Sequence, residues 1–93
     1  MTEITLLTQE DCGYCEHARQ VLARVGKDHP LEVTEIDITS RPGQMLAARA
    51  GVVFAPGLLV DGRPFGYGRI SERRLRRTLQ RLAAEHTEPE VMT

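Results

Sequence analysis

The sequence predicts an α/β fold in which three helices flank a four-stranded mixed sheet, in the chain order βαβαββα. Strand and helix patterns alternate over the first half of the chain, and a strand–helix–strand unit places its strands parallel through a right-handed crossover. An Asp-Gly dipeptide between two short apolar runs then predicts an antiparallel hairpin, and a helical pattern follows it. Helices must cover both faces of such a sheet.

The length of 93 residues indicates one domain, which we expect to span residues 1–87, with residues 88–93 as a flexible C-terminal tail. Apolar residues make up 41% and charged residues 27% of the chain, which excludes the disordered and collagen-like classes. No long apolar run and no secretory leader are recognisable, so we expect a cytoplasmic protein with no membrane partner. The formal net charge of −1 gives no indication of a nucleic-acid partner.

The first three elements follow from apolar periodicity. Residues 3–8 are β-branched and apolar, which is typical of a strand. Residues 31–38 alternate apolar and polar side chains, which predicts a half-buried strand. Between them, Gly26 stands where a helix ends. Steps of three and four separate the apolar residues of that helix: Cys15, Ala18, Leu22 and Val25.

Local capping signals define the second helix. Thr39 and Ser40 are N-cap residue types, and Pro42 suits the first helical turn. We expect the helix to continue through Ala50 and to stop at Gly51.

The last three elements are a hairpin and a helix. Residues 58–60 and 63–65 are the predicted hairpin strands. Ser71 is an N-cap residue for the last helix, and Ile70 can pack on Leu75 as a hydrophobic staple. Its predicted core face consists of Leu75, Leu79, Leu82 and Ala83.

Both cysteines lie in Cys12-Gly13-Tyr14-Cys15, between the first strand and the first helix. Unpaired N–H groups and the helix dipole stabilise a thiolate at that position, so the thiol pKa falls. Cys15 follows one turn later and can attack a mixed disulfide on Cys12. A Cys-x-x-Cys motif near a strand–helix–strand pattern is the redox signature of the thioredoxin-like class.

Two other interpretations of the cysteines are weaker. A structural zinc site needs four ligands, and beside the two cysteines the chain offers only His17, His29 and His86. We therefore predict no metal site and interpret each histidine as a surface residue. A disulfide that closes so short a loop constrains little of the unfolded chain, so a purely structural bridge is disfavoured.

Pro56 opens the third predicted strand, a position at which no N–H is needed for the hydrogen bonds between strands. General frequencies favour a trans Ala55-Pro56 bond, whereas the preceding cysteine motif favours a cis bond.

The chain resembles a glutaredoxin of the thioredoxin-fold superfamily over about residues 3–85, and Cys-Gly-Tyr-Cys is similar to the motif of the mycothiol-dependent mycoredoxins. The resemblance implies a thioredoxin fold and a cis Pro56, and it implies that the backbone of Ala55 binds the substrate. By the same resemblance, the implied substrate-binding residues are Tyr14, Ala55, Pro56, Gly68 and Arg69.

The chain departs from the usual glutaredoxin pattern at three places. Gln9 stands where a lysine is usual, and Phe54-Ala55 replaces Thr-Val before the proline. The sequence from Gly66 to Arg69 reads Gly-Tyr-Gly-Arg, where two glycines and an acidic pair are usual.

We therefore expect a monomeric thiol–disulfide oxidoreductase that reduces protein or low-molecular-weight mixed disulfides. Cys12 is the predicted nucleophile and Cys15 the resolving thiol, which together form an internal disulfide. We expect no cofactor, with glutathione, mycothiol or a flavin reductase as the reductant. The alternatives are a protein that binds a [2Fe–2S] cluster and a partner-specific redox switch that docks through the arginine-rich last helix.

Residues 63–81 form an arginine-rich segment, which is the one strong charge asymmetry of the sequence. It contains a single acid, Glu72, and is either a solvated helix face or a docking patch for anionic groups. Its arginines are Arg63, Arg69, Arg73, Arg74, Arg76, Arg77 and Arg81.

Overall fold

The computed structural model describes residues 1–87, and the expected tail at residues 88–93 lies outside the described residues. The described elements follow the expected order: β1 (Thr2–Thr8), α1 (Gly13–Val25), β2 (Leu31–Asp37), α2 (Arg41–Ala50), β3 (Gly57–Val60), β4 (Arg63–Tyr67) and α3 (Glu72–Thr87). Within these residues, no helix has the length and apolar character that a membrane span requires.

The four strands form one mixed sheet in the order β2-β1-β3-β4. Strands β1 and β2 are parallel, whereas β3 pairs antiparallel with both β1 and β4. Leu7 near the end of β1 lies opposite Gly57 at the start of β3, and Gly57 lies opposite Tyr67 at the end of β4. The loops that follow β1, precede β3 and follow β4 therefore meet at one end of the sheet.

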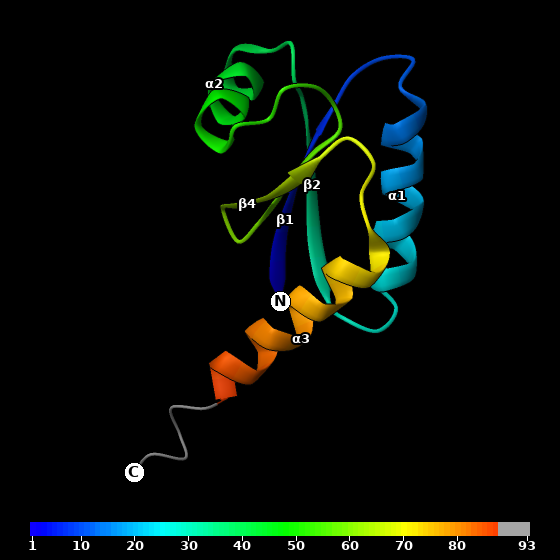
Figure 1. The fold of residues 1–93 in the computed structure, drawn as a ribbon, viewed down its shortest axis with the longest axis vertical. Helices are drawn as coiled ribbons and strands as arrows, with labels where there is room; N and C mark the ends of the chain where they lie inside the picture. The colour runs from blue at the N-terminus through cyan, green and yellow to red at the C-terminus, as the bar shows by residue number, and fades with distance from the viewer. Residues whose placement is uncertain (88–93) are drawn as a thin grey trace.

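Helices cover both faces of the sheet, as predicted. Figure 1 shows α1 and α3 on one side and α2 on the other. The first side holds the larger buried cluster, which joins Leu6 and Leu58 of the sheet to Val21 of α1 and Leu75 of α3. The second side holds a smaller cluster of Leu7, Ala47 and Leu59. This two-sided burial fixes the sheet between the helices.

Several local predictions are confirmed. The Ser40 hydroxyl accepts a hydrogen bond from the Gly43 N–H at 3.1 Å, and Gly51 ends α2 with a left-handed φ of 71°. The Ser71 hydroxyl likewise caps α3 by accepting from the Arg74 N–H at 3.2 Å. Asp61 joins β3 to β4 with a positive φ of 50°. Each feature satisfies a helix terminus or permits a tight turn.

Two expectations about packing were wrong. Strand β2 is mostly exposed, because it is an edge strand and its apolar alternation changes phase after Val33. Ala83 is exposed, because the face of α3 that packs on the core carries Leu75, Leu79 and Leu82, and Ala83 lies to one side of it. The expected end of α1 at Gly26 is confirmed, because Gly26 is the C-cap residue, with a right-handed φ of −62°.

Candidate active site

The Cys12–Cys15 pair lies at the N-terminus of α1 and is joined in a disulfide, with the two Cα atoms 5.2 Å apart. Cys12 is the N-cap residue, and the backbone N–H of Cys15 donates to its sulfur at 3.1 Å. A sulfur replaces the oxygen that usually caps a helix. One helical turn therefore supplies both the second cysteine and a hydrogen bond to the first.

The two cysteine residues differ in their access to solvent. Cys15 is completely buried, whereas Cys12 is half-buried. Gly13, between them, has no neighbouring atom within 4 Å of where a Cβ would stand, so this side of the motif is open. An external thiol or disulfide can therefore reach Cys12, while Cys15 is placed to react only with its neighbour.

The loop before β3 contains a cis peptide bond between Ala55 and Pro56, and both residues are buried. The carbonyl of Pro56 accepts a hydrogen bond from the Gly68 N–H at 2.7 Å. Gly68 has a φ of 77°, a backbone region that favours glycine. The structure thus joins three of the sequence-predicted site residues, at the end of the sheet where α1 begins.

The backbone of Ala55 has no hydrogen-bond partner among residues 1–87. Ala55 lies just before β3, which begins at Gly57. Backbone N–H and C=O groups of this kind need a partner when they are shielded from water. The loop is therefore able to pair with an added extended chain.

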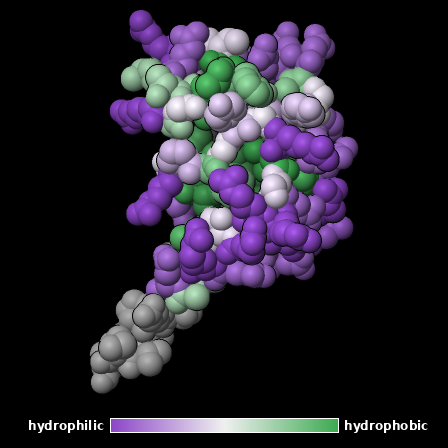
Figure 2. Space-filling view, in the orientation of Figure 1, coloured by the Kyte–Doolittle hydropathy of each residue, from purple (hydrophilic) through white to green (hydrophobic). Residues whose placement is uncertain are grey.

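Aromatic side chains border the site, which the sequence interpretation did not identify. The rings of Phe54 and Tyr67 meet edge to face, with centroids 5.1 Å apart and planes at 89°. Phe54 is 52% exposed, Tyr67 41% and the predicted Tyr14 55%. Figure 2 shows apolar surface at the end of the molecule where the loop between α2 and β3 lies. The adjacent Val53-Phe54 before Ala55 was the one sequence signal for this surface.

Arg69, the last predicted site residue, is exposed and has no ion-pair partner in the described part of the chain. It lines a cavity of about 330 Å³ together with His17 of α1 and Ser71 at the start of α3. His17 is half-buried. Its Nδ1 atom is buried without a hydrogen-bond partner within residues 1–87.

Ion pairs fix α3 against α1 beside this cavity. The pKa of the Glu72 carboxyl lies below its ordinary value because it accepts hydrogen bonds from Arg24, which has the larger effect, and from Arg76. A hydrogen bond from Arg76 likewise lowers the pKa of Asp28. These contacts hold the N-terminal part of α3, and with it Arg69, next to α1.

The described residues contain no group of three or more histidine, cysteine, aspartate or glutamate side chains that could hold a metal ion.

Comparisons with known proteins agree with this geometry. The sequence model of the glutaredoxin-like domain (DUF836) matches residues 3–80. No curated protein matches the sequence. Among solved structures, a mutant thioredoxin from Halobacterium salinarum NRC-1 is 23% identical with a TM-score of 0.66, and covers 86% of this chain and 73% of its own.

Two further thioredoxins are similar in structure. Oxidised thioredoxin O2 from Arabidopsis thaliana is 18% identical with a TM-score of 0.65, over 88% of this chain and 75% of its own. Oxidised mitochondrial thioredoxin 3 from Saccharomyces cerevisiae is 15% identical with a TM-score of 0.62, over 86% of this chain and 77% of its own. These likenesses show that the chain has the thioredoxin fold.

Proposed function

This chain belongs to the glutaredoxin-like domain family, and we propose that it is a thiol–disulfide oxidoreductase that uses Cys12 and Cys15 to reduce disulfides. The position of the Cys12 sulfur is the main support. It caps α1 and accepts the N–H of Cys15, and Cys12 is the more exposed of the two cysteine residues. Helix N-termini favour the thiolate, which is the reacting form of a cysteine.

The reaction proceeds in two exchanges. The Cys12 thiolate attacks one sulfur of the substrate disulfide, the substrate S–S bond breaks, and one substrate thiolate leaves. Cys15 then loses its proton and attacks the Cys12 sulfur, which releases the second substrate thiolate and forms the Cys12–Cys15 disulfide. Two electrons pass to the substrate, whose two thiolates take up two protons. Two equivalents of a small thiol, such as glutathione or mycothiol, or a flavin reductase then restore the dithiol.

The preferred substrate in this proposal is an extended protein segment that contains a disulfide. Ala55 offers an unpaired backbone, and Phe54 and Tyr67 offer exposed ring surface beside it. Added strands gain affinity from backbone hydrogen bonds and specificity from side-chain contacts. Low-molecular-weight mixed disulfides are the second substrate class. The protein acts as a monomer in the cytoplasm, where cells keep catalytic dithiols reduced.

Cysteine variants test the assignment. Reduced wild-type protein is mixed with a peptide that carries one intramolecular disulfide, and mass spectrometry follows both molecules. We expect reduced peptide and oxidised protein in equal amounts. Cys12→Ser should form no product, and Cys15→Ser should accumulate a covalent adduct with the peptide on Cys12. An adduct on Cys15 in the Cys12→Ser variant would instead show that the roles are reversed.

A further inference from the structure

Of the five arginines of the last helix, four fall into two sets that differ in their partners, and Arg73 belongs to neither set. Arg76 belongs to the first set: its guanidinium contacts Asp28 at 2.7 Å and Glu72 at 3.1 Å. Arg24 of α1 completes this network through Glu72 at 2.9 Å. The charge of this set is neutralised within the molecule.

The second set consists of Arg74, Arg77 and Arg81, which have no carboxylate partner among residues 1–87. Steps of three and four place them along one side of α3. They line a cavity of about 470 Å³ between α3 and β4, and no acidic residue lines it. We call this cavity the arginine groove; its other lining residues are Pro64, Phe65 and Thr78.

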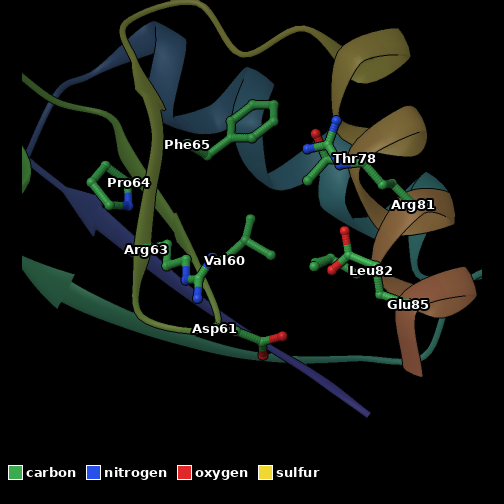
Figure 3. A pocket seen from close by; sticks show the side chains of 9 residues that line it. All are labelled: Val60, Asp61, Arg63, Pro64, Phe65, Thr78, Arg81, Leu82 and Glu85. Carbon is green, nitrogen blue, oxygen red and sulfur yellow. The ribbon is translucent and has the colours of Figure 1, made fainter. Parts of the chain in front are cut away.

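The groove continues toward the hairpin as a second cavity of about 370 Å³ that shares Phe65, Thr78 and Arg81. Figure 3 shows the floor of this second cavity, formed by Phe65 and Val60 from the sheet opposite Leu82 from α3. Its far end carries the two acids Asp61 and Glu85 together with Arg63. Figure 2 shows hydrophilic side chains along α3. The arginine groove itself is therefore lined by cations and by no acid, whereas the second cavity carries two carboxylates beside Arg63 and Arg81.

Arg74 is held in place before any partner binds. Its guanidinium donates to the Phe65 carbonyl and lies over the Phe65 ring, 4.3 Å from the centroid. A fixed cation loses less side-chain freedom on binding than a mobile one. The groove therefore combines one pre-positioned guanidinium with two that are free to form bidentate contacts.

We propose that the arginine groove docks a short acidic segment of a partner protein. Guanidinium groups bind carboxylates in bidentate geometry. The three arginines span seven residues of helix, which is about 10 Å, or roughly three residues of an extended chain. A long polyanion such as nucleic acid fits less well, because past the groove it would meet two carboxylates, Asp61 and Glu85, against the single added cation Arg63.

The groove is also aligned with the proposed active site. Strand β4 lies at the edge of the sheet. Along this strand, Phe65 lines the groove, and Tyr67 two residues later contacts Phe54. Two residues of strand cover roughly 7 Å. If the proposed function holds, an acidic run a few residues from the substrate cysteine would occupy the groove while the disulfide lies at Cys12.

Binding is tested with a fluorescein-labelled deca-glutamate peptide by fluorescence anisotropy, with a deca-glutamine peptide and a single-stranded oligonucleotide as comparison probes. We expect wild-type protein to bind deca-glutamate selectively, and more weakly as salt rises. Arg77→Glu/Arg81→Glu should weaken binding at least roughly tenfold, and Arg77→Gln/Arg81→Gln by less. The charge-matched control is Arg41→Glu/Arg49→Glu, on exposed positions of α2, which should bind like wild type.

Three results would overturn the docking proposal: no binding to wild type, equal loss in the α2 control, or an oligonucleotide that binds at least as tightly as deca-glutamate. Thermal unfolding of each variant checks that it is folded. The binding measurement needs no turnover, so it stands independently of the proposed oxidoreductase activity. A second assay compares the rates at which the protein reduces two disulfide peptides that differ only in a Glu or Gln flank. Faster reduction of the Glu peptide would link docking to catalysis, whereas equal rates would show that docking does not contribute to catalysis.

Discussion

The ring of Phe54 packs edge-on against the ring of Tyr67, so that the loop before β3 and the end of β4 share one aromatic surface at the candidate active site. Gly68 adjoins this pair, since a Cβ at that position would lie 3.1 Å from the Phe54 ring. Only a glycine with its positive φ allows the ring to lie so close to the backbone. Phe54 and Tyr67 therefore give the candidate active site an exposed aromatic surface.

The first prediction concerns this aromatic surface. Phe54→Ala should lower kcat/KM for a disulfide peptide that has apolar residues next to its cysteines. Aromatic contacts contribute about 0.5–1.5 kcal/mol beyond their burial, which corresponds to roughly two- to twelvefold. Val53→Ala, at the exposed neighbouring position, is the control and should behave like wild type. Equal rates for Phe54→Ala and wild type would show that the ring does not contact substrate.

The second prediction concerns the acidity of Cys12. We expect its pKa to lie below the free-thiol value of about 8.5, because the N–H groups at the start of α1 stabilise the thiolate. Asp11 and Glu10 oppose this effect, but exposed charges act weakly through water. The rate of alkylation against pH in reduced Cys15→Ser protein isolates Cys12. A midpoint at or above the free-thiol value would contradict the expectation.

A matched pair of glycine substitutions separates backbone conformation from packing. Neither Gly13 nor Gly51 has an atom within 4 Å of where a Cβ would stand. Gly13 begins α1, so Gly13→Ala should raise the free energy of unfolding by about 0.4–1 kcal/mol. Gly51 has a φ of 71°, so Gly51→Ala should lower it by about 1–2 kcal/mol. Urea unfolding measures both, and changes of the same sign would refute this explanation.

The last prediction concerns the ion pairs between α1 and α3. Hydrogen bonds from arginine lower the pKa of Asp28 and Glu72 in the folded protein. A lowered pKa contributes stability above the ordinary carboxyl range, and that stability is lost as the pH falls through the folded value. Arg76→Gln should therefore be less stable than wild type at neutral pH, with the difference shrinking in acid.

Urea unfolding at neutral and acidic pH measures this difference. Arg73→Gln is the control, since Arg73 is exposed and has no ion-pair partner within residues 1–87. A difference between Arg76→Gln and wild type that stays constant over the whole pH range would show that the ion pairs are not its cause.

The sequence by itself determined the elements and the reactive pair. Ser40 and Ser71 cap helices, Gly51 ends one, and Cys12 and Cys15 lie one turn apart. Each of these features depends on groups only a few residues away along the chain. Side-chain type and spacing are therefore enough to predict them.

Only the tertiary structure decided which surfaces these elements share. The sequence shows a run of arginines, but Arg76 is paired because folding brings Asp28, 48 residues away, within reach of it. Arg77 and Arg81 have no carboxylate partner within residues 1–87, and the groove that they line between α3 and β4 contains no acid. In the same way, strand pairing brings Tyr67 to Phe54. Contacts between residues far apart in sequence depend on how the sheet and helices pack, and no local pattern encodes that packing.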